Sequence, residues 1–499
     1  MKIVIYYGFL LSLMLSAACK STELIDNKTS LLSSESKLVL VDTEDELVDA
    51  LARLEPGTVL EIADGTYRNV NISLTCSGSA DQAIIIKAKN AGKVIFSGDF
   101  HWDIAGSYIT ISGLYFTNGQ RTEDKDLILD TGSNNTYSHC KFNNLNDVRG
   151  TFIKLEGYKS IVEYCEFTGK TTPASYVNMD VPAQGGSHHV IRRNYFSRPS
   201  LGQNGGSAMR VGHGSMAMHH AYILIEENLF ENCDGEEEIV SVKSSRNYIR
   251  RNTFRMCRGA FSLRQGRGSI LEGNFFIGDG QKRCGGLTIR GRDHYVFNNY
   301  FYHLKAKKTG VINFGVASPE DPERIKLGMY PRHFPLTQDI VICYNTIVEN
   351  KSLHHINFLE GYGTRKRYDL PTNIQFYNNV FDGEIGLMDA KPNMEVVFEG
   401  NYTSKKKSEV KGVMSSSIEK QQLDGLKCVV LVNNGLDKHS AKLPTQSNYS
   451  VFEHRDLSLS KDVFGRTRQE FKHAGCVNWN SNNPAVYLPI SKNKVGCGF

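Results

Sequence analysis

Chemically reactive side chains gather in one short stretch, DGEEEIVSVKSS, which spans residues 234–245 of the 499-residue chain. Glu236 and Glu238 are two residues apart, so their carboxylates share one face wherever the backbone is extended. Carboxylates with an amide oxygen nearby are hard ligands that suit calcium, and Asn204 of an NGG motif can supply the amide. The simpler interpretation is a solvated acidic turn neutralised by nearby arginines, and spacing alone favours it.

Basic residues end four short apolar runs of the same pattern. The runs are SAMR, VSVK, FSLR and LTIR, ending at Arg210, Lys243, Arg264 and Arg290. Side chains alternate along a strand, so the basic residue of each run points outward when the apolar residues point inward. Runs stacked at the spacing of parallel strands, about 4.8 Å, would align the basic groups in a column. Such a column suits an anionic polysaccharide lying along the stack, although solvated basic residues are also common on such faces.

The acidic pair and Lys243 have opposite parity along the stretch. Val240 and Val242 point inward, and an unbroken strand would drive Glu236 and Glu238 into the core with them. We therefore expect a turn near residues 238–240. That turn would place the carboxylates at a corner beside the basic column.

These runs belong to a repeat that extends through most of the chain. An apolar strand, then Asn or Cys, one residue and an aromatic recur at steps of 22 to 46 residues. The repeat positions are Phe116, Phe142, Phe167, Phe196, Phe230, Phe254, Phe276, Phe301, Ile347, Phe381 and Thr403. Steps of 22 to 26 residues suit one three-stranded coil of a parallel β-helix, with stacked Phe inside and stacked Asn at one turn. The longest steps contain extended loops, such as the one around residues 305–334.

The predicted fold class is therefore all-β, a single-stranded right-handed parallel β-helix with an N-terminal capping helix. Residues 42–58 have the amphipathic pattern expected of that helix. We expect a signal peptide over residues 1–19, a linker over 20–37 and the catalytic β-helix over 38–404. Residues 405–499 are expected to form the final coils and cap of the same domain.

The N-terminal sequence MKIVIYYGFLLSLMLSAAC is typical of a secretion signal, and its end resembles a bacterial lipoprotein box. We expect lipidation at Cys19, with plain cleavage after Ala18 as the alternative. The protein would then be exported to the periplasm or cell surface as a monomer, attached to a membrane only through its lipid.

A net charge of +5 is too weak to indicate nucleic acid, and the scattered cysteines lack the spacing of a zinc site.

The combination of NGGSAMRVG, DGEEEIVSVKSS, FSLRQG and TIRGRDHYVFNNYF resembles polysaccharide lyase family 6, which contains alginate lyases and chondroitin B (dermatan sulfate) lyases. The resemblance covers the chain from about residue 40 onward. It implies that Asn204, Glu236 and Glu238 bind Ca²⁺. It also implies that Lys243 is the general base and that Arg264 is the acid or charge stabiliser. One departure is Gln265, because many relatives have histidine after the catalytic arginine.

The reaction implied is β-elimination in a uronic acid polymer, assisted by calcium. Neighbouring uronates or sulfates would be held by Arg290, Arg210, His213, His294 and Arg365. Alginate is the expected substrate, as the commoner activity among relatives. The basic TRKR cluster at residues 364–367 keeps dermatan sulfate as the alternative. A glycoside hydrolase using the paired carboxylates, or a non-catalytic polysaccharide binder on the same solenoid, also stays open.

Overall fold

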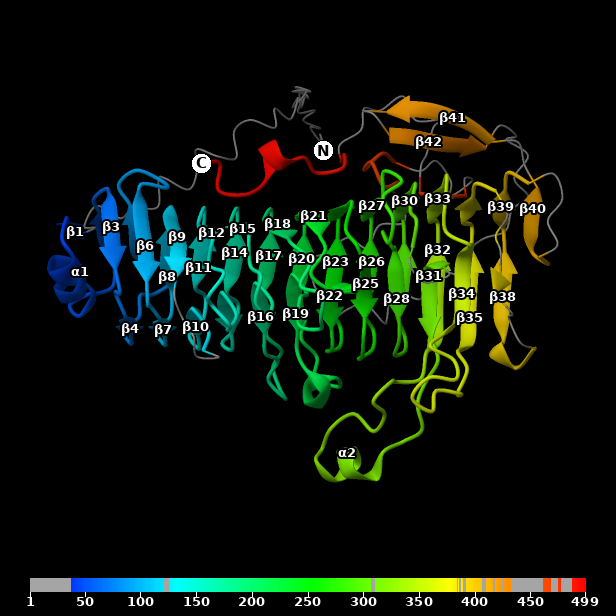
Figure 1. The fold of residues 1–499 in the computed structure, drawn as a ribbon, viewed down its shortest axis with the longest axis horizontal. Coiled ribbons are helices and arrows are strands. Elements are labelled where there is room, and N and C mark those ends of the chain that lie inside the picture. Colours follow the sequence, from blue (N-terminus) through cyan, green and yellow to red (C-terminus); the bar gives the residue numbers. More distant parts are fainter. Residues whose placement is uncertain are drawn as a thin grey trace, which may run out of the picture.

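The computed structural model describes residues 37–119, 125–306, 310–383, 385, 387–388, 392–405, 410–415, 418–423, 426–431, 461–467, 474–476 and 487–499. Within these ranges, three parallel sheets of 14, 12 and 14 strands run the length of an elongated molecule (Figure 1). Successive coils add one strand to each sheet. This is a right-handed parallel β-helix, and the predicted fold class is confirmed. The predicted signal peptide with Cys19, and all of the predicted linker except Lys37, lie outside the described residues.

The three parallel sheets are named A, B and C here. Sheet A contains β1 (Lys37–Val41), β2 (Thr58–Ile62), β5 (Ile84–Ala88), β8 (Ile109–Ser112), β11 (Thr136–Ser138), β14 (Ile161–Glu163), β17 (Val190–Arg192), β20 (Leu224–Glu226), β23 (Tyr248–Arg250), β26 (Ile270–Glu272), β29 (Tyr295–Phe297), β32 (Gln338–Cys343), β35 (Thr372–Tyr377) and β38 (Val396–Glu399). Sheet B contains β3 (Gly65–Arg68), β6 (Val94–Gly98), β9 (Leu114–Gly119), β12 (Lys141–Asn143), β15 (Glu166–Phe167), β18 (Tyr195–Arg198), β21 (Leu229–Cys233), β24 (Thr253–Arg255), β27 (Phe275–Ile277), β30 (Tyr300–Tyr302), β33 (Thr346–Val348), β36 (Val380–Phe381), β39 (Asn401–Thr403) and β40 (Val413–Ser415). Sheet C contains β4 (Ile72–Leu74), β7 (Trp102–Ile104), β10 (Ile128–Asp130), β13 (Ile153–Leu155), β16 (Val177–Met179), β19 (Met209–Val211), β22 (Glu238–Val242), β25 (Ala260–Leu263), β28 (Leu287–Ile289), β31 (Gly310–Gly315), β34 (His354–Glu360) and β37 (Leu387–Met388).

The predicted repeat positions face one another from coil to coil. All eleven, from Phe116 to Thr403, are register partners in sheet B. The rings from Phe116 to Phe301 stack in the core; Phe142 and Phe167, for example, have centroids 5.0 Å apart and planes 8° apart. The aromatic repeat of the sequence is therefore a buried stack, which Ile347 interrupts.

A second ladder, made of asparagines, runs beside the phenylalanine stack. Its members are Asn194, Asn228, Asn252, Asn274, Asn299, Asn345, Asn379 and Asn401. Each side-chain amide donates to the amide oxygen of the next coil, as from Asn252 Nδ2 to Asn274 Oδ1 at 3.0 Å. Two earlier coils place Cys140 and Cys165 at the same position, both buried and free. The predicted asparagine stack is confirmed.

The N-terminal end is capped by a helix, α1, that is shorter than expected. It spans Glu44–Leu51 rather than residues 42–58. Thr43 begins it, because its hydroxyl accepts a bond from the backbone amide of Glu46 at 3.2 Å. Pro56 and Gly57, whose φ is 79°, follow within a turn and prevent its extension.

The described residues contain no helix that is long and apolar enough to cross a membrane.

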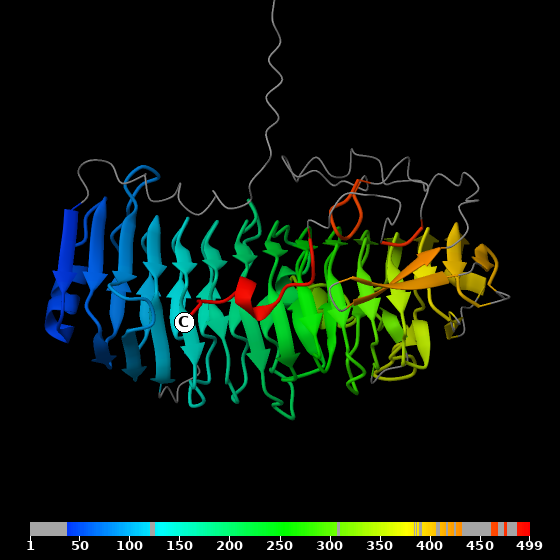
Figure 2. The same ribbon diagram turned by 90° about the horizontal axis from the view of Figure 1, so that it is seen from above.

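The C-terminal part, for which the sequence predicts final coils and a cap, is described only in separate segments. Of its described residues, only β40 extends a parallel sheet, while β41 (Ile418–Leu423) and β42 (Leu426–Leu431) form an antiparallel hairpin. Residues 487–499 then run back along the outside of sheet B (Figure 2). The Ile490 amide donates to Thr253 Oγ1 at 2.8 Å, and Lys141 Nζ donates to the Phe499 carbonyl at 3.2 Å. This segment binds earlier coils instead of adding new ones.

Replacing Asn274 with alanine should destabilise the protein. The change removes two bonds that the side chain donates and two that its oxygen accepts from Asn252. Because the polar groups left behind are buried, we expect a loss of about 3 kcal/mol in the free energy of unfolding, measured with urea.

Arg255→Ala is the control for this variant. It removes an exposed ion pair with Asp279 on the same sheet and should cost less than about 1 kcal/mol. Equal losses in the two variants would contradict a structural role for the asparagine ladder.

Candidate active site

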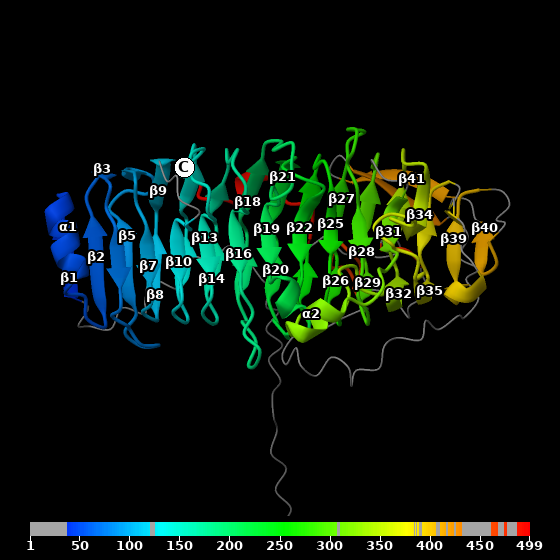
Figure 3. The same ribbon diagram turned by 60° about the horizontal axis from the view of Figure 1, so that its bottom comes forward.

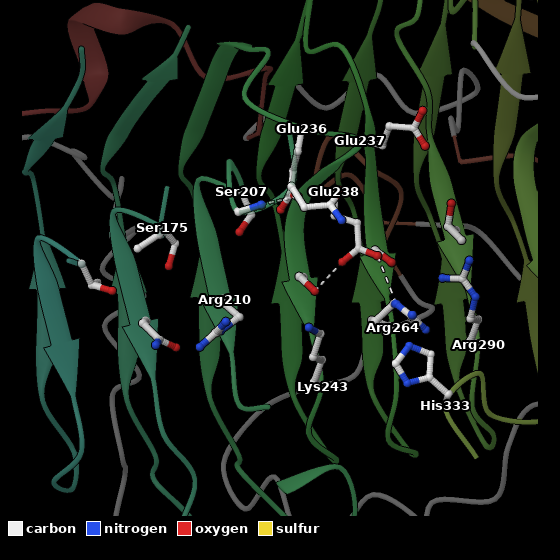
Figure 4. Close-up of a pocket in the computed structure, with 18 of the residues that line it drawn as sticks. Ser175, Ser207, Arg210, Glu236, Glu237, Glu238, Lys243, Arg264, Arg290 and His333 are labelled. Atoms are coloured by element: carbon white, nitrogen blue, oxygen red, sulfur yellow. Dashed lines mark hydrogen bonds and ion pairs between the residues drawn. The ribbon is translucent and has the colours of Figure 1, made fainter. Parts of the chain in front are cut away.

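A cavity of about 410 Å³ lies on the outward face of sheet C (Figure 4). Five successive strands of the sheet line it with one register position each, namely Asn178, Arg210, Ser241, Ser262 and Thr288. Other lining residues include Asn204, Glu236, Glu238, Lys243, Arg264, Arg290, His333 and Arg365. The structure thus brings eight of the ten predicted site residues to one cavity.

Three of the four predicted basic residues form a column. Lys243, Arg264 and Arg290 follow directly after Val242, Leu263 and Ile289, which are register partners. Arg210 stands two residues earlier, opposite Ser241, so it belongs to the neighbouring ladder and not to the column. Lys243 consequently lies between Arg210 and Arg264, as Figure 4 shows.

The parity change between the glutamates and Lys243 comes from a β-bulge. Glu238 is paired with Ala260 and Val240 with Phe261, which leaves Ile239 as an extra residue in β22. Ile239 is buried, and the bulge allows Glu238 and Lys243 to face the same cavity. The expected break is present at the expected residues, but it is a bulge within a strand and not a corner turn.

The two carboxylates have different environments. Glu236 Oε2 accepts a hydrogen bond from the Gly205 amide at 2.9 Å, and burial raises the pKa of Glu236. The neighbouring charge of Glu238 raises it further. Glu238 itself accepts from Ser241 Oγ at 2.6 Å and pairs with Arg264 Nε at 3.2 Å. Glu237 between them is exposed and lies apart from the pair in Figure 4.

Lys243 is set up to lose its proton more easily than an ordinary lysine. Burial lowers its pKa, and the positive charges of Arg210 and Arg264 lower it further. Glu238 opposes this effect, but among the described residues it forms its ion pair with Arg264 and not with Lys243. A neutral amine facing an open cavity can act as a base.

Arg264 stays charged beside this amine. Burial and then the charge of Arg290 lower the pKa of Arg264 to about 10, still well above neutrality. Its Nη1 atom is buried and has no hydrogen-bond partner within the described part of the chain. A buried donor without a partner is costly, so this atom is suited to an oxygen of a bound ligand.

A buried ion cluster holds the column in place at one end. Glu360 Oε2 lies 2.5 Å from Arg290 Nη2 and 2.6 Å from Arg367 Nη2, and all three side chains are buried. Arg290 therefore lines the cavity with its charge already paired. Arg367 of the TRKR cluster has a structural role, whereas Arg365 reaches the cavity wall.

His333 is a cavity residue that the sequence did not single out. It lies in a loop after β31 that contains α2 (Pro322–Lys326), and Gln265 Nε2 donates to its carbonyl at 3.5 Å. Gln265, which stands where many relatives have histidine, therefore contacts the loop that carries His333. The long repeat step at residues 301–347 signals the loop, but nothing in the sequence shows where it folds.

Two predicted substrate-binding histidines do not line the cavity. His294 is fully buried; its Nδ1 accepts from the Ser269 amide and its Nε2 donates to the Arg290 carbonyl, each at 3.1 Å. Burial lowers its pKa to about 4, so it is a neutral core residue, and the prediction for it is wrong. His213 lies half-buried before the short helix η2 (Gly214–Met216), with its Nδ1 2.8 Å from Ser215 Oγ, outside the cavity.

The sequence profile of the family described as Chondroitinase B matches residues 41–464. The chain belongs to the chondroitinase B family. These proteins make up polysaccharide lyase family 6, so the family resemblance read from the motifs is confirmed. Sequence comparison with curated proteins gives no match.

Solved structures of the chondroitinase B family share the fold. The alginate lyase AlyGC superposes with a TM-score of 0.75 and 24% identity, over 92% of this chain and 58% of its own. A mannuronic acid-specific family 6 lyase from human gut microbiota gives 0.69 and 24%, over 77% and 92%. Pedsa3628 from Pseudopedobacter saltans gives 0.68 and 19%, over 92% and 99%. This chain therefore spans 58% of the length of AlyGC.

The side chains present in this family member fit a calcium ion. Asn204, Glu236 and Glu238 line the same cavity, and their oxygens are the hard donors that calcium prefers. The described ranges contain no group of three or more His, Cys, Asp or Glu side chains placed to hold a metal. An ion here would therefore need the Asn204 amide and further oxygens from water or ligand.

Replacing Glu360 with alanine should lower the free energy of unfolding. It leaves Arg290 and Arg367 buried without their carboxylate, and breaking such a cluster costs about 3–5 kcal/mol. Urea unfolding at neutral pH measures the loss.

Glu323→Ala is the matched control, because Glu323 pairs with Lys326 at the surface of α2. It should change the free energy of unfolding by less than about 1 kcal/mol. A Glu360 variant as stable as this control would contradict the role of the buried cluster.

Proposed function

We propose that this protein is a polysaccharide lyase that cleaves a uronic acid polymer by β-elimination, and that this polymer is alginate. The observation that carries the proposal is the placement of Lys243. It faces a cavity between Arg210 and Arg264, and burial and both arginines lower its pKa. A lysine with a lowered pKa beside fixed positive charges is the arrangement needed to remove a proton next to a carboxylate.

In the proposed reaction, the neutral Nζ of Lys243 removes the carbon-5 proton of a uronate. The electron pair of that bond forms the double bond between carbons 4 and 5. The bond from carbon 4 to the linking oxygen breaks, and the oxygen leaves with a proton delivered through water. One product carries an unsaturated uronate at its new end, and the other carries a free hydroxyl.

Negative charge develops on the uronate carboxylate as the proton leaves, and Arg264 is placed to stabilise it. Its buried Nη1 lacks a partner among the described residues, and its charge persists at neutral pH. Arg210 and Arg365, which line the same cavity, would hold neighbouring acidic sugars. Fixed charges in a partly buried site cost no reorganisation during the reaction.

Calcium is the proposed cofactor, held by Asn204, Glu236 and Glu238. When bound, it would supply positive charge that neutralises the substrate carboxylate and makes the adjacent proton more acidic. The raised pKa of Glu236 supports this placement, because it reflects first the burial of the carboxylate and then the nearby charge of Glu238.

Alginate and dermatan sulfate remain the two candidate substrates. Several structures with this fold are alginate lyases, and one is a family 6 alginate lyase in complex with a trisaccharide. The family profile is named for chondroitinase B, and Arg365 in the cavity wall could meet a sulfate. We favour alginate because Arg367, the last basic residue of the TRKR cluster, is already paired with Glu360.

Purified protein should generate ultraviolet absorbance from alginate, because elimination creates a conjugated double bond. Lys243→Ala should lower kcat at least about 100-fold, while the fold and substrate binding persist. Lys87→Ala, a surface variant paired with Glu61 in an early coil, should react normally. Normal turnover by the Lys243 variant would remove Lys243 as the base.

The same assay on dermatan sulfate separates the remaining alternatives. If absorbance appears with dermatan sulfate and not with alginate, dermatan sulfate is the substrate. New reducing ends without absorbance would indicate a hydrolase, and binding without any product would indicate a non-catalytic protein.

Chelation of calcium should suppress activity, and added calcium should restore it. Calorimetry should detect calcium binding to the native protein and its loss in Glu236→Gln. Glu237→Gln is the matched control and should bind as the native protein does, because Glu237 lies apart from the pair. Full activity in metal-free protein, or equal binding by both variants, would argue against the site.

A further inference from the structure

The cavity is not centred on the proposed reacting groups. Its lining follows one outward ladder of sheet C through five strands, from Asn178 to Thr288. Lys243 and Arg264 follow the third and fourth of these strands, β22 and β25. One strand, β28, lies beyond Arg264 inside the cavity, whereas β19 and β16 lie on the other side of Lys243, followed by the lining residue Thr151.

The next strand beyond β28 is covered. The register partner of Thr288 is Asn313 in β31, which is only 3% exposed and does not line the cavity. Low exposure alone does not set Asn313 apart, because Ser241 and Ser262 of the same ladder are as buried and still line the cavity. What changes at β31 is that the ladder no longer contributes to the lining, so the floor of the cavity ends at β28.

The basic column ends at the same place. Gly315 occupies the column position after Arg290, and a Cβ at residue 315 would lie 2.5 Å from Arg290 Cγ. The Arg290 side chain therefore lies across the glycine. Its guanidinium pairs with Glu360, the register partner of Gly315. The column position after Gly315 thus carries the negative charge of Glu360 instead of a basic group.

Two loops cover this end, and together we call them the end wall: residues 316–337 and 361–369. They are tied to each other, because the Ala317 amide donates to the Asp369 carbonyl at 2.8 Å and Arg332 pairs with Asp369. Figure 3 shows the first loop, with α2, projecting beside β26, β28 and β29. Each loop contributes one residue to the cavity lining, His333 and Arg365.

Phe334 anchors the end wall on the basic groups. Its ring centroid lies 4.4 Å from the guanidinium carbons of both Arg264 and Arg367, and 5.6 Å from that of Arg290. Contacts of this kind are favourable and become stronger when they are buried, as Phe334 is. The wall is therefore packed against the column and forms a fixed end to the cavity.

We propose that the end wall makes the enzyme exolytic: it accepts the end of a polysaccharide chain and releases products of about one or two sugars, since only one strand spacing of about 4.8 Å lies between the reacting groups and the wall. A strand spacing is comparable to the length of one sugar, so a polymer lying along sheet C cannot continue past β28. This inference rests on the proposed lyase function.

The size of the first products tests the proposal with the native protein on polymeric alginate. Monosaccharide or disaccharide should appear from the earliest time point while viscosity falls slowly. At equal, subsaturating mass, substrate shortened tenfold should react about tenfold faster, because the reactive species is the chain end. Unsaturated products of mixed size with a rapid fall in viscosity would overturn the exolytic proposal and leave the lyase function intact. Absence of any unsaturated product from the polymers tested would overturn both.

A variant of the wall provides a second test. Phe334→Ala removes the anchor and should shift early products towards longer oligosaccharides, whatever its effect on total rate. Leu327→Ala, at the exposed tip of the same loop, is the matched control and should keep the native product sizes. If Phe334→Ala is folded by circular dichroism and active, but gives the native product sizes, the wall does not determine them.

Discussion

Every functional side chain of this protein depends on the register that the buried ladders impose between coils. The asparagine side chains satisfy one another across coils, and a shift of one residue would leave several buried amides unpaired at about 1–3 kcal/mol each. The phenylalanine stack fixes the same register through packing. Lys243 and Arg264 stand on adjacent strands only because Val242 and Leu263 are partners in that register.

Charge at the site is organised by the same constraint. The column places Lys243, Arg264 and Arg290 one strand apart, which would repel if nothing balanced it. Glu238 balances Arg264 from within the cavity, and Glu360 balances Arg290 from behind the wall. Burial is the largest cause that lowers the pKa of Lys243; Arg210 and Arg264 lower it further, while Glu238 and Glu236 oppose them. The site thus holds Lys243 as an amine that loses its proton more readily than an ordinary lysine.

Repetition explains what the sequence could predict. The aromatic and asparagine positions recur once per coil, so the fold follows from their spacing. The same spacing predicts the column for Lys243, Arg264 and Arg290, and the parity change at residues 238–240 follows from the alternation of side chains along one strand. Contacts that loops and turns make with distant residues do not follow from spacing. His294 looked like a ligand because its burial depends on a turn in three dimensions, and His333 was overlooked because its loop packs back over a distant strand. The N-terminal capping helix was predicted and is present, but it ends at Leu51, before the predicted end at residue 58.

The returning C-terminal segment has a consequence for how the chain acquires its structure. Solenoid coils mostly contact their neighbours, so such a chain could in principle form coil by coil as it is made. Here the bond between Lys141 and Phe499 joins residues 358 positions apart, and that between Ile490 and Thr253 joins residues 237 apart. The outer surface of the early coils is therefore completed only after residues 487–499 have been synthesised. Long-range closure of this kind slows folding, and it leaves that face of a growing chain open until this segment is available.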